Sequence, residues 1–129
     1  MPISYAKVTS YLDAIAAKGN LDVANSPHGQ FWSGMTRDQF VTGTVPGVLC
    51  HGAPIPIVDQ SNLPASAANS AILLILTQMT GVCNKGQMPK TGPFITDQNY
   101  TVTLADGSIV SGTQIQNDIL DWLNHGFPA

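Results

Sequence analysis

Charged side chains are scarce in this sequence of 129 residues. Only 10% of the residues are Asp, Glu, Lys or Arg, and five basic residues against eight acidic ones give a net charge of -3. Binding to a phosphate backbone requires clustered Lys and Arg side chains. The composition therefore predicts a neutral, polar surface and argues against a nucleic acid partner.

Long apolar runs are also missing. The longest, residues 71–76, is far shorter than the roughly 20 residues that a transmembrane helix needs. Residues 1–4 are not followed by the basic and apolar regions of a signal peptide. We therefore expect no membrane insertion. The low-charge, polar composition is nevertheless typical of exported proteins, so we expect a secreted or periplasmic protein.

Cysteine is almost absent. The two residues, Cys50 and Cys83, form no Cys-x-x-Cys pair, which excludes a zinc ribbon and a thioredoxin-type redox motif. A disulfide between Cys50 and Cys83 would suit an oxidising compartment. Two buried free thiols are the alternative, and the sequence leaves both open.

Common catalytic and metal-binding motifs are missing too. The three histidines share no His-x-x-x-His or His-Glu-x-x-His spacing, and neither Gly-x-Ser-x-Gly nor a phosphate-binding glycine loop occurs. Four acidic residues are expected in a loop, in a turn and at two solvated helix positions, respectively: Asp97, Asp106, Asp118 and Asp121. We therefore expect a binding module rather than an enzyme.

The N-terminal half predicts two helices. The first spans about residues 4–18 and ends at Gly19 as its C-cap. Its apolar face consists of Tyr5, Val8, Leu12, Ile15 and Ala16. Thr36 and Gln39 have the spacing of a capping box, which starts a short second helix. Trp32, in the segment between the helices, is expected to attach a long loop to the core.

Prolines limit which secondary structure the middle of the chain can form. With Pro46, Pro54 and Pro56, residues 44–63 are expected to form extended chain across the surface or over a pocket, outside any helix or central strand. The next helix is expected to begin at Pro64 or Ala65 and to end near Met79, and its apolar residues cover more than one face.

The C-terminal part predicts a hairpin and a last helix. Alternating residues on both sides of Asp106-Gly107 predict a β-hairpin over residues 100–110. The last helix is expected to begin near Ser111 or Thr113 and to end at Gly126. Its buried face is expected to consist of Ile115, Ile119, Trp122 and Leu123.

The order of motifs in the second half is distinctive. An apolar helix, about residues 66–79, is followed by a loop that begins with Met88-Pro89 and ends in a Gly-Pro pair, and then by a helix that closes on residues 122–128, Trp-Leu-Asn-His-Gly-Phe-Pro. This order resembles the C-terminal half of class I c-type cytochrome domains. The resemblance covers about half of the chain. It implies a mainly α-helical, cytochrome-c-like single domain over residues 1–129, with four helices, one β-hairpin and long Pro-rich loops.

The same resemblance implies a candidate cofactor site. Met88 would occupy the position of the axial methionine, and Cys50-His51 would be the end of the haem-attachment motif, with a thioether from the cysteine and an iron ligand from the histidine. The first cysteine of that motif is replaced by Gly47 here. A haem-free descendant of the fold, with Cys50 and Cys83 bridged, is therefore the favoured interpretation.

The expected function follows from these observations. We expect a non-catalytic binding or structural module without a cofactor, which presents residues 44–58 and 84–97 to a protein or a small molecule. One alternative is an electron-transfer protein that holds haem through Cys50, His51 and Met88. Another is a small copper-binding protein, since the His51 imidazole, the Met88 thioether and the Cys50 thiolate all suit copper.

Overall fold

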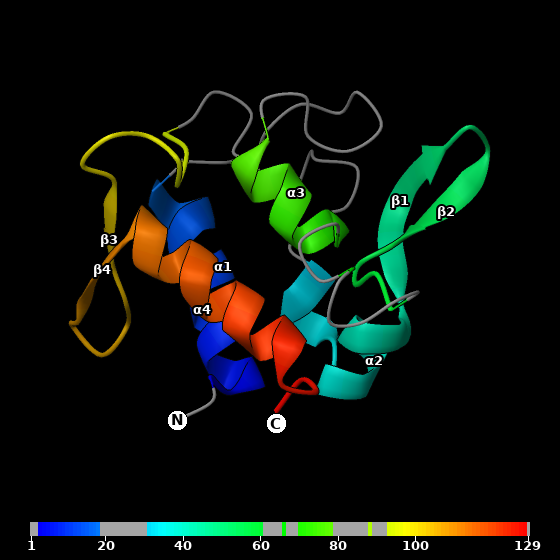
Figure 1. Ribbon diagram of the computed structural model, residues 1–129, viewed down its shortest axis with the longest axis horizontal. Helices are drawn as coiled ribbons and strands as arrows, with labels where there is room; N and C mark the ends of the chain where they lie inside the picture. Colours follow the sequence, from blue (N-terminus) through cyan, green and yellow to red (C-terminus); the bar gives the residue numbers. More distant parts are fainter. Residues whose placement is uncertain are drawn as a thin grey trace.

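Helices and two small sheets make up the structure, a computed structural model that describes residues 3–18, 31–60, 66, 70–78, 88 and 93–128. In chain order the elements are α1 (Tyr5–Lys18), the 3-10 helix η2 (Phe31–Gly34), α2 (Arg37–Thr42), β1 (Thr44–Cys50), β2 (Ala53–Pro56), α3 (Ala71–Thr77), β3 (Thr101–Thr103), β4 (Ile109–Ser111) and α4 (Gly112–Asn124) (Figure 1). Strands β1 and β2 pair in one antiparallel sheet, and β3 and β4 pair in another. The described part is a mixed α/β fold, so the prediction of a mainly α-helical domain with one hairpin is wrong.

The β1–β2 ribbon is the element that the sequence prediction missed. Its strands are joined by the two residues His51 and Gly52, which have φ of 52° and 82°. Positive φ at both central residues is what a type I′ turn requires, and this turn matches the twist of a two-stranded ribbon. A His-Gly turn is a weaker sequence signal than Asp-Gly, and for this reason only the second hairpin was expected.

The prolines of β2 are compatible with pairing because of where they fall in the register. Cys50 pairs with Ala53 beside the turn, Leu49 pairs with Pro54, and Thr44 pairs with Pro56. Inward- and outward-facing N–H groups alternate along an antiparallel strand. Beside the turn, the N–H of Ala53 points inward, toward β1. The backbone nitrogens of Pro54 and Pro56 therefore fall at outward positions, where the missing N–H removes no hydrogen bond between the strands. Proline excluded a central strand here, as expected, but not a two-stranded ribbon.

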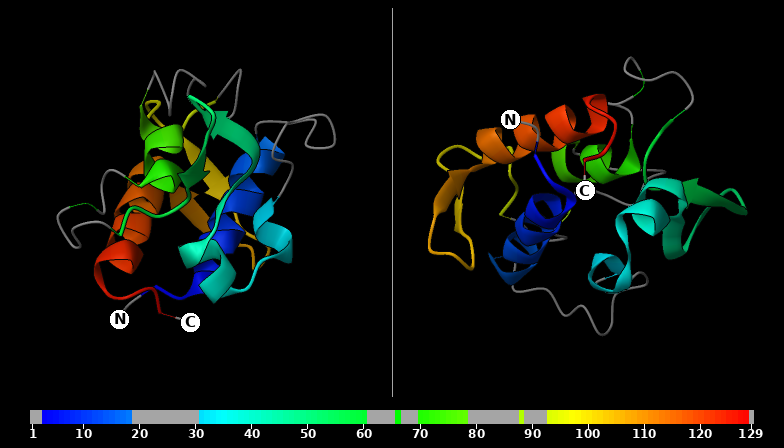
Figure 2. Two further views of the ribbon diagram at one scale, coloured as in Figure 1. Left: turned by 90° about the vertical axis from the view of Figure 1, so that its right-hand side faces the viewer. Right: turned by 90° about the horizontal axis from the view of Figure 1, so that it is seen from below.

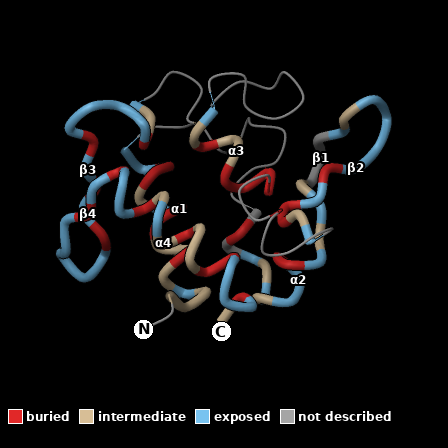
Figure 3. The backbone as a smooth tube through the Cα atoms, in the orientation of Figure 1, coloured by how far each residue is buried: buried red, intermediate tan, exposed pale blue. Residues whose placement is uncertain are grey.

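Helices α1 and α4 pack against each other in the middle of the molecule, between the two sheets (Figures 1 and 2). Both confirm the sequence prediction in position, and α4 also confirms its predicted buried face. On α1 the buried face includes Tyr11, which the sequence prediction missed, and Tyr5 is only half-buried. The fully buried side chains along them include Val8, Ile115, Ile119 and Trp122. The tube in Figure 3 shows the buried stripes of both helices and the exposed turn of the β1–β2 ribbon. The C-cap expected at Gly19 lies outside the described residues.

The β3–β4 hairpin and the start of α4 also confirm their predictions. Asp106 accepts hydrogen bonds from the Ser108 backbone N–H at 2.9 Å and from the Ser108 hydroxyl at 2.5 Å, and Gly107 has a φ of 88°. Helix α4 begins after Ser111, whose Oγ accepts from the Gln114 N–H at 3.1 Å. Gly112 is required there, because a Cβ on it would lie 1.9 Å from the Ile95 carbonyl oxygen.

Helix α3 is shorter than the sequence predicted. It begins at Ala71 instead of Pro64 or Ala65. Ser66 lies in a turn, and Ser70 has an extended backbone with a ψ of 138°. The Ser70 hydroxyl oxygen accepts the Asp59 N–H at 2.9 Å, so a tertiary contact uses the residue that a longer helix would have included. Met79, the expected last residue, lies outside the described residues.

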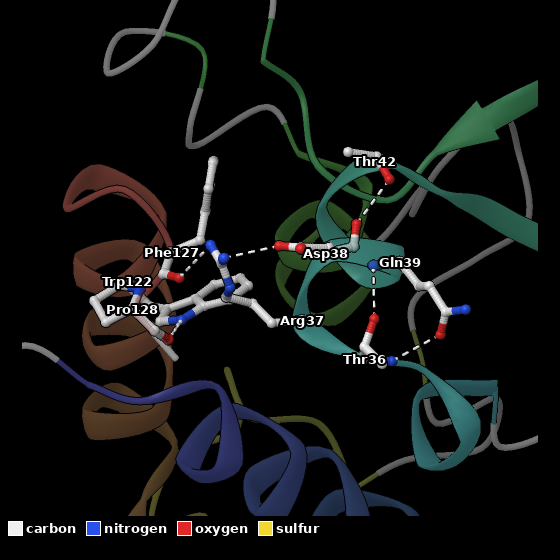
Figure 4. A network of polar contacts seen from close by, with 8 residues as sticks. All are labelled: Thr36, Arg37, Asp38, Gln39, Thr42, Trp122, Phe127 and Pro128. Atoms are coloured by element: carbon white, nitrogen blue, oxygen red, sulfur yellow. Dashed lines mark hydrogen bonds and ion pairs between the residues drawn. The ribbon is translucent and has the colours of Figure 1, made fainter.

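The C-terminal segment is fixed to α1 and α2. The Pro128 carbonyl oxygen accepts the Tyr5 N–H and the Trp122 Nε1–H, each at 2.9 Å, and Arg37 donates to the Phe127 carbonyl oxygen at 3.2 Å (Figure 4). The predicted capping box of α2 is present beside it: the Gln39 N–H reaches the Thr36 hydroxyl, and the Thr36 N–H reaches the Gln39 side chain. The two ends of the described chain therefore lie side by side.

None of the helices in the described ranges is both long and apolar enough to cross a membrane.

Candidate functional site

The structure places the predicted haem-attachment residues at the turn of the β1–β2 ribbon. Cys50 is half-buried at the end of β1, and His51 is exposed in the turn. The backbone of His51 has the positive φ of a type I′ turn, so a local structural requirement accounts for this position. Sequence comparison with the haem motif gave the same residue a different role, as an iron ligand.

Met88 lies beside α3. Its backbone N–H donates to the Ile75 carbonyl oxygen at 2.8 Å. A haem ligated by His51 and Met88 would require both side chains to face one cavity. His51 is exposed in the turn, and Met88 is half-buried. The exposed position of His51 therefore gives no support to a haem bound through both residues, and haem binding stays a prediction.

The remaining predictions concern a disulfide with its neighbouring loop, and a copper site. Cys83 lies outside the described residues, so the Cys50–Cys83 disulfide stays a prediction, as does the prediction for residues 84–87 and 89–92. Among the described residues there is no cluster of three or more His, Cys, Asp or Glu side chains that could hold a metal ion. The copper site proposed for His51 and Met88 therefore has no observed geometry.

A pocket of about 480 Å³ lies between α2, β2 and α3. Apolar side chains dominate its described lining: Val41, Ile55, Pro56, Val58, Ala71 and Leu74. Thr42, Asp59 and Gln60 contribute polar groups. Ligand-binding pockets typically have volumes of about 300–1,000 Å³ and combine an apolar wall with a few polar groups, which is the arrangement found here.

Hydrogen bonds hold residues 57–60 between the two helices that form the pocket walls. On the α2 side, the Ile57 N–H donates to the Gly43 carbonyl oxygen at 3.1 Å. On the α3 side, the Ile72 N–H donates to the Ile57 carbonyl oxygen at 3.1 Å, and the Ser66 hydroxyl donates to the Asp59 carbonyl oxygen at 2.7 Å. Because both walls are bonded to one segment, the pocket is formed before any ligand binds.

A second polar cluster joins α1 to α4. The Tyr11 hydroxyl donates to Asp118 Oδ2, and the Gln114 side chain donates to Asp118 Oδ1 at 2.7 Å. Burial, followed by the hydrogen bond to Asp118 and the charge of Asp118, raises the pKa of Tyr11 well above its ordinary value. Asp118 lies on α4, as predicted, and it is half-buried, with its carboxylate hydrogen-bonded to two side chains. These hydrogen bonds connect α1 to α4 and use both carboxylate oxygens of Asp118, so we assign the cluster a structural role.

Tyr100 is a buried tyrosine with an unsatisfied hydroxyl. Its side chain is 5% exposed, and its oxygen has no hydrogen-bond partner among the described residues. Burial, together with the charge of Asp97, raises the pKa of Tyr100 to about 12. The Lys18 ammonium lies 5.2 Å from the ring centroid. These neighbours stabilise the ring without satisfying the hydroxyl.

The sequence indicated only one part of the pocket. Residues 44–63 were expected to run across the surface or over a pocket, and Ile55, Pro56 and Val58 line a pocket. The remaining wall comes from the end of α2 and from α3, which are distant in the sequence and follow no motif spacing. No sequence signal identifies such a set, because each residue alone reads as an ordinary helix or core position.

Compared with family models, with curated proteins and with solved structures, the chain matches none. The resemblance to class I c-type cytochromes therefore stays a prediction.

Proposed function

We propose that this protein is a non-catalytic binding module, secreted or periplasmic, whose ligand occupies the pocket between α2, β2 and α3. The observation that supports this proposal is the pocket itself, with about 480 Å³ of space and a mainly apolar lining. Burial of a ligand's hydrocarbon against such a wall contributes roughly 25 cal/mol for each Å² removed from water.

The fixed walls support binding rather than simple packing. A pocket that closes only around its ligand loses affinity to the cost of ordering its loops. Here Gln60 is already bonded to the end of α2, with its Nε2 2.9 Å from the Val41 carbonyl oxygen, and the Asp59 N–H is bonded to Ser70 near the start of α3. The binding surface therefore needs little rearrangement.

The test uses a neutral, apolar fluorescent probe, N-phenyl-naphthylamine, with the full chain. We expect saturable binding, with amide chemical-shift changes concentrated at Gly43, Ile55 and Leu74. The substitution Leu74→Trp places a larger side chain in the pocket and is expected to weaken probe binding at least about tenfold, equivalent to about 1.4 kcal/mol.

The matched control is Ile109→Trp, because Ile109 is a large aliphatic residue that is 72% exposed on β4. This variant gains the same indole outside the pocket and should bind the probe as the parent does. The proposal is contradicted if the parent shows no saturable binding, or if Leu74→Trp and Ile109→Trp bind the probe equally well.

The proposal includes no cofactor. The two alternatives, a haem-binding electron-transfer protein and a copper-binding protein, would both be coloured, so an absorption spectrum distinguishes them from it. We expect protein made in a host with working cytochrome maturation to be colourless after purification. A Soret band that persists through denaturation would instead assign Cys50 as a thioether anchor, and its low-spin form should then depend on Met88. A blue or green copper adduct that is lost in His51→Ala would support the copper-binding alternative.

A further inference from the structure

The start of β3 carries a sequence motif that the pocket does not involve. Residues 97–101 are Asp-Gln-Asn-Tyr-Thr, and within them Asn99-Tyr100-Thr101 has the form Asn-x-Ser/Thr with a residue other than proline in the middle. This form is the acceptor sequence for N-linked oligosaccharides, and it occurs once in the chain. Three residues can match by chance, so the structural setting of the motif has to be compatible with a glycan.

Both side chains that the motif requires lie at the surface. Asn99 and Thr101 are exposed, whereas the side chain of Tyr100 between them is only 5% exposed. The buried ring of Tyr100 attaches the motif to the core through its middle residue, which is the one position where the acceptor sequence tolerates almost any side chain. The amide of Asn99 and the hydroxyl of Thr101 therefore stay accessible in the folded protein.

The backbone of the motif is held by hydrogen bonds that leave the Asn99 side chain outside. The Tyr100 N–H donates to the Asp97 carbonyl oxygen at 3.3 Å, and the Tyr100 carbonyl oxygen accepts the Gly112 N–H at 3.1 Å. Asn99 itself has a φ of 64°, a conformation that Asn adopts more readily than most residues. Glycine would meet this backbone requirement equally well, but it has no amide to modify.

The outer face of the β3–β4 hairpin has room for a bulky group. Thr101 pairs with Ser111 and Thr103 pairs with Ile109, and all four side chains are exposed. The hairpin lies at the end of the molecule opposite the β1–β2 ribbon (Figures 1 and 3). A glycan next to this face would extend into solvent, at the other end of the molecule from α2 and β2, which form two walls of the pocket.

We propose that Asn99 is an attachment site for an N-linked oligosaccharide. The proposal rests on the export that the proposed function includes, and it adds a covalent modification. In the transfer, the side-chain nitrogen of Asn99 attacks the anomeric carbon of a lipid-linked oligosaccharide. The new carbon–nitrogen bond replaces the bond from that carbon to the diphosphate of the lipid. The diphosphate leaves with the bonding electrons, and the nitrogen gives up one proton to a base of the transferase. The Thr101 hydroxyl is the group by which the transferase recognises the acceptor.

Asp97 distinguishes the two kinds of enzyme that could attach the glycan. Transferases of the eukaryotic secretory pathway need only residues 99–101, whereas those of the bacterial periplasm also need an acidic residue two positions before the asparagine. Asp97 occupies that position. Its carboxylate accepts the Phe94 N–H at 2.8 Å, and an Asn side chain has an oxygen that can accept the same bond. Asp97→Asn therefore removes the charge and keeps the local hydrogen bond.

The test is export of the full chain, behind a secretion signal, in eukaryotic cells and in bacteria whose periplasm contains an oligosaccharyltransferase. Tandem mass spectrometry of the peptide that contains Asn99 measures the modification. We expect a glycan on Asn99 in both hosts. Asn99→Gln and Thr101→Ala should lose it completely, and Thr101→Ser should keep it. Asp97→Asn should lose it in the bacterial host alone.

The matched control is Thr103→Ala, because Thr103 is an exposed threonine on the same strand and lies outside the motif. This variant should carry the glycan as the parent does. The peptide is taken from total cell protein, so a variant that does not fold still gives a result. Absence of a glycan from the parent in both hosts would overturn the inference, as would a glycan on Asn99 that persists in Thr101→Ala. A glycan in one host alone would support it and identify the kind of transferase.

A last comparison separates this inference from the proposed function. The glycosylated parent should keep the circular dichroism spectrum of the unmodified chain and should bind N-phenyl-naphthylamine equally tightly. Loss of folding on glycosylation would overturn the inference, since Asn99 would then not be a surface position. Failure of both forms to bind the probe would overturn the proposed function and leave the attachment site supported.

Discussion

At the scale of single residues, Trp122 is the side chain on which the core depends most. It is 0% exposed, its ring centroid lies 5.4 Å from Phe127 and 5.9 Å from both Tyr5 and Phe40, and its N–H is bonded to Pro128. The rings come from α1, α2 and the C-terminal segment, so one side chain connects three separate parts of the chain. Aromatic contacts of this kind add to the hydrophobic gain from burial.

We predict that Trp122→Ala lowers the free energy of unfolding by about 3–5 kcal/mol, as expected for loss of a buried large aromatic. Urea denaturation followed by circular dichroism measures the change. Trp122→Phe keeps an aromatic ring and loses the N–H, so it should cost less than Trp122→Ala. Coincident urea denaturation curves for Trp122→Ala and the parent would show that the contacts of Trp122 with Tyr5, Phe40 and Phe127 do not stabilise the fold.

A second prediction concerns the unsatisfied hydroxyl of Tyr100. Because this hydroxyl is buried without a partner among the described residues, Tyr100→Phe should raise the free energy of unfolding by about 1 kcal/mol. Tyr11→Phe is the matched control, since the Tyr11 hydroxyl donates to Asp118 and its loss should cost about 1.5–3 kcal/mol. Urea denaturation of both variants tests whether Tyr100→Phe gains stability while Tyr11→Phe loses it. A loss of stability in Tyr100→Phe would contradict the assignment of its hydroxyl as unsatisfied.

At the scale of elements, the β1–β2 turn gives a prediction that separates a backbone role of His51 from a ligand role. Asn adopts positive φ more readily than most residues, and Asn-Gly is a favoured type I′ pair. His51→Asn should therefore keep the stability of the parent or raise it by a few tenths of a kcal/mol. Thermal denaturation, monitored by circular dichroism, measures the difference.

The control for the turn is Gly52→Ala. Gly52 has a φ of 82°, and a Cβ there costs roughly 1–2 kcal/mol in the left-handed region. This variant should be less stable than the parent. If His51→Asn lost as much stability as Gly52→Ala, the imidazole itself would contribute, and its role as a ligand would have to be considered again.

How well each element could be predicted depended on whether its signal was local. The capping box of α2 and the Asp-Gly hairpin involve residues at most a few positions apart, and both predictions are confirmed. The predicted start of α3 was wrong because Ser70 accepts a hydrogen bond from the Asp59 N–H, a tertiary contact that helix periodicity does not reveal. The pocket was predictable only along residues 44–63, since its other walls are assembled by tertiary packing.

At the scale of the whole molecule, the tyrosines make stability dependent on alkaline pH. The chain has three tyrosines, and burial raises the pKa of each: of Tyr100 to about 12, and of Tyr5 and Tyr11 above the ordinary value. The unfolded chain therefore loses these protons near pH 10, while the folded chain keeps them. The stabilisation is fully present below about pH 10 and is lost as the pH rises toward 12.

We predict that tyrosinate absorbance at alkaline pH appears only together with unfolding. The measurement is a pH titration in which ultraviolet absorbance of tyrosinate and far-ultraviolet circular dichroism are recorded on the same samples. The two signals should change in one transition above pH 10. A tyrosine that ionises near its ordinary pKa while the circular dichroism signal is unchanged would contradict the burial of that residue.

The two prolines of β2 have a consequence for how molecules of this protein meet one another. A free strand edge that presents N–H donors can recruit a strand from another chain, and this is a common route to aggregation. Pro54 and Pro56 leave the outer edge of β2 without donors at both positions, and the register of β1 is irregular between Thr44 and Leu49. The ribbon has no charged residue between positions 43 and 58 and so lacks the usual protection by lysine, and on the β2 side the two prolines oppose growth into an intermolecular sheet instead.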